Sequence, residues 1–313
     1  MRRVTALSMV TAALLAACSS TAAHPAPTTT VGASASNVVG SASFPVSVTA
    51  ANGNVTIPAR PTRILSLSPT ATEMLYAIGA GPQVAGVDKY STDPPNAPRT
   101  RFDGTEGAES YVPLHPDLVV IWSDSTGKLA GQLATLHIPA LLLPPAATID
   151  DTYSQLMVLG RATGHAAEAA RESASIREQL DSITRSVGNR AKGVTYYHEV
   201  DNTLYTATSK TFIGALYARL GMVNVADPAD HGGSGYPQLS AEYLVKADPD
   251  YVFLADTVCC HESAATFAAR PGFSAMTAVR QHHVVGLPDP IASQWGPRVV
   301  DFLRDVAAAV TRG

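Results

Sequence analysis

The chain has 313 residues, of which 46% are hydrophobic and 15% charged, and its formal net charge is −4. Enough apolar residues are present to bury a sizeable core, so the composition excludes collagen-like, coiled-coil and wholly disordered chains. The negative charge excludes a protein held on nucleic acid by a strong positive field. At roughly 150 residues per domain, the length suggests about two domains.

The first 17 residues are predicted to be an export signal. Met1-Arg2-Arg3 is basic, residues 4–15 form a short apolar run, and Ala16-Ala17-Cys18 follows. This layout is typical of a signal peptide and too short for a permanent membrane span. Small residues directly before a cysteine resemble the lipobox of bacterial lipoproteins, so we expect Cys18 to be lipidated. The alternative is an ordinary secretory signal that happens to contain a cysteine.

The segment after Cys18 is predicted to be a flexible tether over residues 18–60. Residues 19–43 are rich in Ala, Ser, Thr and Pro and contain no Asp, Glu, Lys or Arg. Such a segment cannot bury enough apolar surface to offset the entropy lost on ordering. A tether between a lipid anchor and a folded body implies a function near a membrane but not in it.

From residue 64 onward, strand and helix patterns alternate, which predicts an α/β fold with mostly parallel sheets covered by helices. Ser68 and Pro69 favour the start of a helix. Residues 166–187 contain no Pro or Gly and predict one long helix. The predicted strands are 64–67, 84–87, 118–121, 140–143, 194–197, 251–254 and 284–287, and the other helices are 71–78, 128–136, 149–162, 212–220 and 299–310.

The two halves of this pattern repeat each other. Glu109 precedes Pro116-Asp117 by seven residues, and Glu242 precedes Pro249-Asp250 by the same seven. We therefore expect two similar Rossmann-like lobes, over residues 61–165 and 191–313, joined by the long helix within 166–190. A cleft between two lobes is where small ligands bind.

Several motifs in this order resemble one known family. The chain is similar to the helical-backbone class of ABC-importer substrate-binding proteins, which carry ferric siderophores, haem or cobalamin. The likeness runs from about Pro61 to the C-terminus. The motifs that carry it are residues 63–73 (RILSLSPTATE), 84–87 (VAGV), 90–95 (YSTDPP), 116–120 (PDLVV), 236–240 (YPQLS), 249–250 (PD) and 296–298 (GPR).

The resemblance implies a monomeric, non-enzymatic protein that captures a chelate outside the cell and delivers it to a membrane permease. It implies a location on the outer face of the cytoplasmic membrane, attached by the lipid alone. Glu109 and Glu242 match the acids that dock onto the permease in this family. Simple capping of helix N-termini is the alternative role for both.

Seven side chains are predicted to line the ligand cleft. The aromatic ones offer flat apolar contact to a macrocycle, and the arginines pair with anionic groups. For each aromatic residue the alternative is core packing, and for each arginine a solvated surface position. The set is Tyr90, Arg99, Arg101, Trp122, Tyr236, Trp295 and Arg298.

No resident cofactor or bare metal site is expected. The histidines are scattered, with no His-x₃-His helix, although axial ligation of haem by a Tyr or His remains open. Cys259 and Cys260 are adjacent and are a candidate vicinal disulfide, with free thiols as the alternative. Their spacing is unlike that of a zinc site.

Two alternative functions remain at this point. Iron chelates, meaning ferric siderophores or haem, come first as ligands, and cobalamin is second. From another class, an exported hydrolase is weakened because residues 232–236 only superficially resemble a nucleophile elbow.

Overall fold

The described part of the chain contains two parallel sheets, one in each half. The computed structural model describes residues 43–312, so Cys18 and the predicted signal peptide lie outside the described residues. Residues 43–312 fall within a single compact unit. None of the helices in this range has the length and apolar character needed to cross a membrane.

The N-terminal lobe is built on a four-stranded sheet in the order β4-β3-β5-β6, in which all neighbours are parallel. Its strands are β3 (Ile64–Leu67), β4 (Val84–Val87), β5 (Leu118–Ile121) and β6 (Ala140–Leu142). Its helices are α1 (Pro69–Ala77), α2 (Lys128–Thr135) and α3 (Ile149–Thr163), with the short 3-10 helices η1 (Gly81–Gln83), η2 (Ala108–Ser110) and η3 (Val112–Leu114).

The C-terminal lobe is built on a second four-stranded parallel sheet, in the order β10-β9-β7-β8. Its strands are β7 (Thr195–Glu199), β8 (Val223–Asn224), β9 (Tyr251–Leu254) and β10 (Val284–Gly286). Its helices are α5 (Phe212–Arg219), α6 (Ala241–Ala247), α7 (Ala264–Ala268), α8 (Thr277–Arg280), α9 (Asp289–Ala292) and α10 (Val299–Arg312), with η4 (Asp227–Ala229) and η5 (Phe273–Ala275).

The two sheets have the same topology. If the strands of each lobe are numbered 1 to 4 in chain order, β3 to β6 in one and β7 to β10 in the other, both sheets have the spatial strand order 2-1-3-4. Asp117 accepts hydrogen bonds from the backbone N–H and the hydroxyl of Thr62, and Asp250 accepts the same pair from Thr195. Each aspartate thus ties the third strand of its lobe to the start of the first. The predicted repeat and the α/β class are confirmed.

Local sequence signals explain where the first helix of each lobe begins and ends. Ser68 caps α1 and Thr211 caps α5, each by accepting a hydrogen bond from a backbone N–H in the first turn. Gly79 and Gly221 follow the two helices with φ of +83° and +79°. Glycine adopts this left-handed conformation at little cost, so both helices end at equivalent points.

A hairpin precedes the N-terminal lobe. β1 (Val46–Ala50) and β2 (Gly53–Ile57) pair antiparallel. Val48 and Ile57 are buried in the hydrophobic core, and the Ala51 N–H donates to the edge strand β6 at 3.0 Å. The predicted flexible tether is therefore wrong for residues 46–57, because this segment is paired as strands and its alternate side chains are buried or partly buried against the core.

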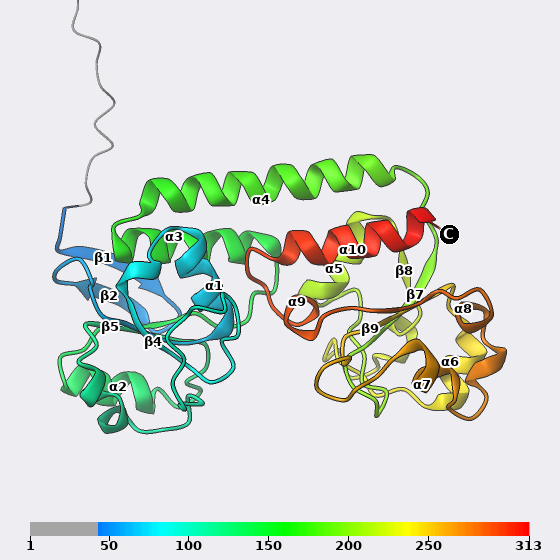
Figure 1. Cartoon of the computed structure of the whole chain (residues 1–313), viewed down its shortest axis with the longest axis horizontal. Coiled ribbons are helices and arrows are strands. Elements are labelled where there is room, and N and C mark those ends of the chain that lie inside the picture. Colours follow the sequence, from blue (N-terminus) through cyan, green and yellow to red (C-terminus); the bar gives the residue numbers. More distant parts are fainter. Residues whose placement is uncertain (1–42, 313) are drawn as a thin grey trace, which may run out of the picture. The chain divides into compact units, whose positions relative to one another are not determined.

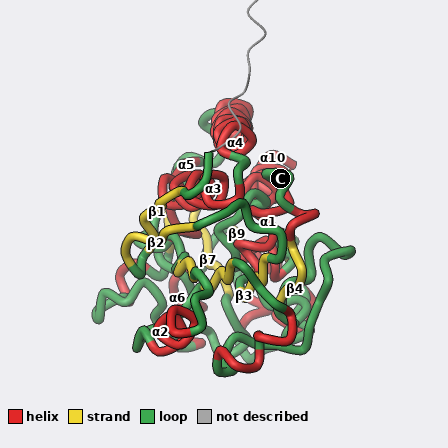
Figure 2. The backbone as a smooth tube through the Cα atoms, turned by 90° about the vertical axis from the view of Figure 1, so that its left-hand side faces the viewer, coloured by secondary structure: helices red, strands yellow, loops and turns green. Residues whose placement is uncertain are grey.

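Two segments connect the lobes. The first is α4 (Ala166–Val187), which has the predicted bounds and packs against α3 and α10. These three helices lie together on one side of the two sheets (Figures 1 and 2). The second is residues 293–298, here called the strap, which joins α9 to α10 within the C-terminal lobe and contacts α1 and α3 of the N-terminal lobe.

Candidate functional site

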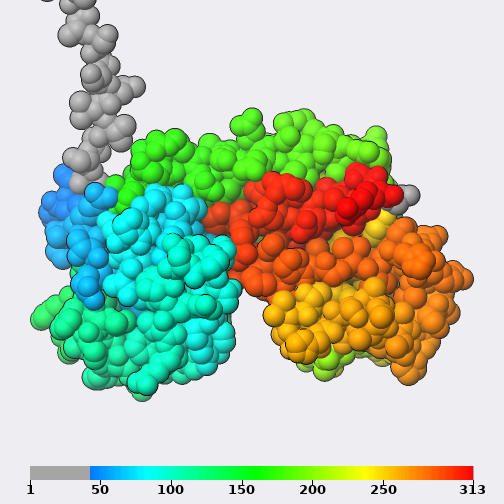
Figure 3. All heavy atoms as spheres, in the orientation of Figure 1, coloured from blue at the N-terminus to red at the C-terminus, as the bar shows by residue number. Residues whose placement is uncertain are grey.

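The strands of each lobe end at one edge of a parallel sheet, and ligands of α/β sheets bind outside this edge. The molecular surface is hollowed between the two lobes, on the side away from α4 (Figure 3). The side chains that follow β4 and β5 in one lobe, and β7 and β9 in the other, are therefore the candidates for ligand contact.

Tyr90 and Trp122 are presented to solvent at the edge of the N-terminal sheet. Tyr90 follows β4 and is 57% exposed. Its turn is held by buried Asp88, whose carboxylate accepts hydrogen bonds from the N–H groups of Tyr90 and Ser91 at 3.1 and 2.7 Å. Trp122 directly follows β5, is 44% exposed, and lines a hollow of about 160 Å³ with Asp103. Aromatic rings held outward in this way suit a flat apolar ligand.

Arg99 and Arg101 are exposed and form no ion pair within residues 43–312. Arg101 lines a different hollow from Trp122, beside η2 and η3. The cation over the Tyr90 ring is Lys89, whose Nζ lies 4.9 Å from the ring centre and 3.1 Å from Asp103. Sequence reasoning missed Lys89, although it directly precedes Tyr90.

In the C-terminal lobe, two exposed tyrosines lie on neighbouring loops. Tyr236 is 48% exposed and Tyr205 is 42% exposed. The loops are joined because the Thr206 N–H donates to Pro237 O at 3.1 Å and Tyr205 bridges to Gln238. Sequence analysis singled out Tyr236 only, since no motif surrounds Tyr205.

Trp295 lies in the strap and contacts the N-terminal lobe. Its Nε1 donates to Gln155 Oε1 at 3.0 Å, and its backbone carbonyl accepts from the Thr152 hydroxyl at 2.8 Å. Both partners belong to α3. Trp295 is partly buried and packs against the hydrophobic core. Core packing, the alternative role for this side chain, therefore accounts for much of its surface.

Arg298 ends the strap and is paired with acids of the N-terminal lobe. It forms an ion pair with Glu73 of α1 and lies 3.6 Å from Asp93. Burial raises the pKa of Glu73, although the Arg298 guanidinium acts in the opposite direction. A Cβ at Gly296 would lie 3.1 Å from Glu73 Oε2, so this glycine lets the strap backbone approach closely. Arg298 thus joins the two lobes, and its contact with a ligand stays a prediction.

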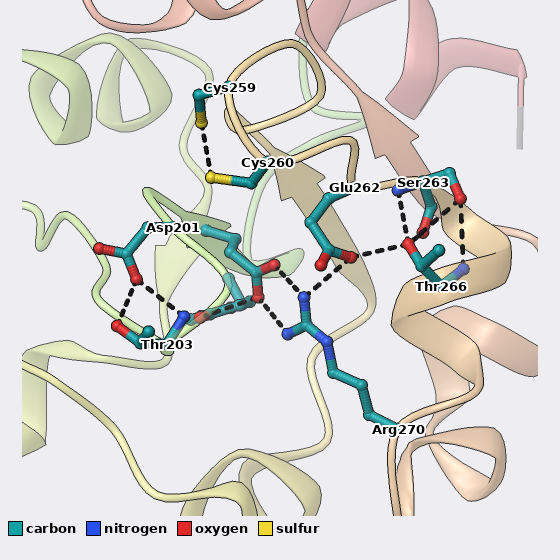
Figure 4. Close-up of polar contacts among 10 residues, drawn as sticks. Asp201, Thr203, Cys259, Cys260, Glu262, Ser263, Thr266 and Arg270 are labelled. Atoms are coloured by element: carbon teal, nitrogen blue, oxygen red, sulfur yellow. Dashed lines mark hydrogen bonds and ion pairs between the residues drawn. The ribbon is translucent and has the colours of Figure 1, made fainter.

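An ion-pair network lies at the carboxyl ends of β7 and β9 (Figure 4). Glu199, the last residue of β7, is fully buried and accepts hydrogen bonds from Arg270 at 2.8 and 2.6 Å. Arg270 also pairs with Glu262 at 3.0 Å. Glu199 and Arg270 of this network are 71 residues apart in the sequence, so no local motif marks the network.

Asp256 lies beside this network, two residues after β9. It is buried, and within residues 43–312 its two carboxylate oxygens have no hydrogen-bond partner. Burial, followed by the charges of Glu199 and Glu262, raises the pKa of Asp256 to about 7. Three acids and one arginine leave this edge of the C-terminal sheet acidic.

Glu109 and Glu242 occupy equivalent, exposed positions in the first turns of η2 and α6. The pair η2–η3 in one lobe and α6 in the other are each followed by a residue in the left-handed conformation, His115 (φ +46°) or Asp248 (φ +40°), and then by a core strand. A hydrogen bond from its own backbone N–H lowers the pKa of Glu242. Neither acid forms an ion pair in the described part of the chain.

The described residues contain no group of three His, Cys, Asp or Glu side chains placed to hold a metal ion. His198 is fully buried in β7, with Nδ1 2.9 Å from the Tyr217 hydroxyl, and burial lowers its pKa to about 4. The carboxyl edges of the two sheets instead carry exposed aromatic rings and charged side chains.

The chain matches known proteins over most of both lobes. The model of the periplasmic binding protein family matches residues 64–291. A cobalamin-binding protein of Halobacterium salinarum is 31% identical over 277 residues, which cover 85% of this chain and 74% of that protein. An uncharacterized ABC transporter substrate-binding lipoprotein of Bacillus subtilis is 28% identical over 277 residues, covering 85% and 86%.

The fold also matches solved structures. A periplasmic heme-binding protein from Roseiflexus sp. RS-1 has a TM-score of 0.71 at 22% identity, covering 80% of this chain and 98% of that chain. This likeness shows a shared two-lobed fold. Together with the family match across residues 64–291, it establishes that the chain belongs to the periplasmic binding protein family.

Proposed function

We propose that this chain is the solute-binding component of an ABC importer and captures a bulky metal chelate outside the cytoplasm. The observation that carries the proposal is the pair of matching lobes, each with two exposed aromatic side chains at the carboxyl edge of its sheet. These are Tyr90 and Trp122 in one lobe and Tyr205 and Tyr236 in the other. Two such edges can hold a large flat ligand from both sides.

The charges at these edges favour a ligand with little net negative charge. The guanidinium of Arg298 is paired with Glu73, that of Arg270 with Glu199, and the ammonium of Lys89 with Asp103. An anionic ligand would have to compete with these carboxylates for each of these three cations, whereas Arg99 and Arg101 form no ion pair within residues 43–312. Because three of these five cations are already paired with carboxylates, we rank an uncharged ferric siderophore above haem, whose propionates are anionic, among iron chelates.

Cobalamin is the second candidate ligand. The relative from Halobacterium salinarum is named as a cobalamin-binding protein and is 31% identical to this chain. The corrin ring carries amide side chains, which are uncharged and need no cationic partner. Aromatic side chains at both edges suit its flat macrocycle.

Substitutions at the two edges test whether ligand binds there. We expect Tyr90→Ala and Tyr236→Ala each to weaken chelate affinity about tenfold, equivalent to about 1.4 kcal/mol. Val223→Ala is the matched control, because Val223 is 49% exposed but begins β8, at the opposite edge of the sheet. Unchanged affinity in both tyrosine variants would contradict the site. Recovery of a chemically altered ligand would favour an exported enzyme instead.

We further propose that Cys18 carries a lipid anchor and that Glu109 and Glu242 dock onto the permease. Two exposed acids that lie at matching positions and form no ion pair within residues 43–312 suit a partner with two similar basic sockets. The test is chelate uptake by cells that carry Glu109→Ala and Glu242→Ala together, with Glu178→Ala on the exposed face of α4 as control. We expect uptake to be lost in the double variant while ligand binding is retained. Normal uptake would contradict the docking role.

A further inference from the structure

Cys259 and Cys260 lie in the turn between β9 and α7, with their side chains directed toward each other (Figure 4). Their Sγ atoms are 2.7 Å apart. They are the two cysteines of residues 43–312. Successive side chains of an extended chain point in opposite directions, so facing sulfurs are a specific feature of this turn.

The backbone on both sides of the pair is held by two aspartates. The Asp289 carboxylate accepts hydrogen bonds from the N–H groups of Val258 and Cys259 at 2.9 and 2.7 Å. The Asp256 carbonyl accepts from the N–H groups of Cys260 and Glu262 at 3.2 and 3.3 Å. The turn remains open to reagents, because Val258 is 64% exposed and Cys259 is also exposed.

The surroundings of the pair oppose a thiolate. Partial desolvation, the neighbouring Cys260 thiol and the Asp289 carboxylate raise the pKa of Cys259 to about 12. A thiolate is the form that acts as a nucleophile or binds a metal, so this environment disfavours both roles for Cys259. Protonated thiols and a disulfide both carry no charge beside Asp289, so these surroundings accept either form, and the facing sulfurs are what favours ring closure.

We propose that Cys259 and Cys260 are an oxidation site that closes to a vicinal disulfide by exchange with a disulfide reagent. Cys260 loses its proton, and its sulfur attacks the reagent disulfide and displaces one reagent sulfur as a thiol. The other cysteine then loses its proton and attacks the mixed disulfide, which releases the second reagent thiol. One S–S bond forms in the protein and one breaks in the reagent, which takes up two protons and two electrons.

This modification adds to the capture of a solute and does not require it. The closed ring would restrict the turn that carries Glu262, and Glu262 in turn pairs with Arg270. We therefore expect oxidation to slow amide hydrogen exchange across residues 256–263. Because no ligand takes part, failure of this inference would leave the proposed function untouched.

The test is a count of thiols at these two positions in the purified full chain. One sample is incubated with oxidised glutathione and another with a reductant. Both are quenched in acid, alkylated in denaturant and digested. The mass of the peptide that contains both cysteines is then measured by mass spectrometry. We expect no alkylation and a loss of two hydrogen atoms in the oxidised sample, and two alkyl groups in the reduced one. Alkylation of both cysteines after oxidation, or glutathione retained on either, would overturn the proposal.

The Cys259→Ser variant is the matched control. It keeps Cys260 in the same turn but cannot complete the second exchange. We expect oxidised glutathione to leave a mixed disulfide on Cys260 in this variant. Absence of that adduct, together with free thiols in the oxidised wild-type chain, would show that the site does not exchange.

Discussion

Arg298→Met is expected to destabilise the protein by about 3 kcal/mol, because it leaves the buried carboxylate of Glu73 without its cation. The Glu73 side chain is 4% exposed, and its Oε2 has no hydrogen-bond partner within residues 43–312. The bond from Arg298 to Oε1 is therefore the compensation for burying this charge.

The size of the effect follows from the burial of the two partners. Removing one partner of a buried ion pair costs about 3–5 kcal/mol. The Arg298 side chain is 26% exposed, so water already shields part of the interaction and the lower end of that range applies. For a chain of this size, about 3 kcal/mol corresponds to a Tm lower by about 6–12 °C.

The loss should depend on pH. Burial raises the pKa of Glu73 even with Arg298 present, and without the guanidinium it rises further. A raised pKa in the folded state contributes stability at low pH that is lost as pH rises. The destabilisation by Arg298→Met is therefore expected to be larger at pH 8 than at pH 5.

A double-mutant cycle measured by urea unfolding checks the pair. The Glu73→Gln and Arg298→Met variants and their combination are followed by circular dichroism and tryptophan fluorescence at both pH values. Arg304→Met is the control, because Arg304 pairs with Asp301 on the exposed surface of α10 and its loss should cost less than about 1 kcal/mol. Additive effects of the two substitutions would refute an energetic link between strap and α1.

Four further substitutions test other parts of the structure. Asp256→Asn should remove a fall in stability of about 2 kcal/mol between pH 5 and pH 8, because a buried carboxyl with a raised pKa loses its proton in that window; an unchanged pH slope in urea unfolding would contradict this. The free energy of unfolding should fall by about 3 kcal/mol from pH 7 to pH 4, because the His198 side chain takes up a proton at a higher pH in the unfolded chain than in the folded one. His198→Asn should remove this fall, which urea unfolding measures in the same way. Gly214→Ala should destabilise by about 2 kcal/mol or more, because its Cβ would lie 2.0 Å from the Thr208 carbonyl oxygen. Gly131→Ala, with nothing within 4 Å of the new Cβ, should instead stabilise by about 0.5–1 kcal/mol.

The elements that could be predicted from the sequence are those fixed by local chemistry. Ser68 before Pro69 marks the start of α1, and the buried runs at 64–67 and 118–121 are strands as expected. The equal spacing of Glu109 and Glu242 from the following strands predicted equivalent positions, which the matching left-handed residues support.

The hairpin at residues 46–57 was missed although a signal was present. Apolar and polar residues alternate there around Asn52 and Gly53, and such a pair is a strong hairpin turn signal. Gly53 has a φ of +99° at this turn. The tether prediction rests on the Ser, Thr and Ala content of residues 19–43, and its bounds extend across this hairpin.

The contacts that could not be predicted are those between distant residues. Arg298 and Glu73 are 225 positions apart, and Arg270 and Glu199 are 71 apart. From the sequence alone, Arg298 is a candidate to bind an anion. Its partner Glu73 comes next to it only in the folded chain, where the strap lies on α1. Long-range pairing thus decided which of the predicted cations are available at the site.

The most direct test of the central claim is a calorimetric titration of the purified chain with an uncharged ferric siderophore, cobalamin and haem, with a sugar and free ferric ion as controls. We predict saturable binding of one chelate per chain, with an uncharged ferric siderophore or cobalamin bound more tightly than haem. Binding of a sugar or the free ion, with none of the three chelates bound, would contradict the account.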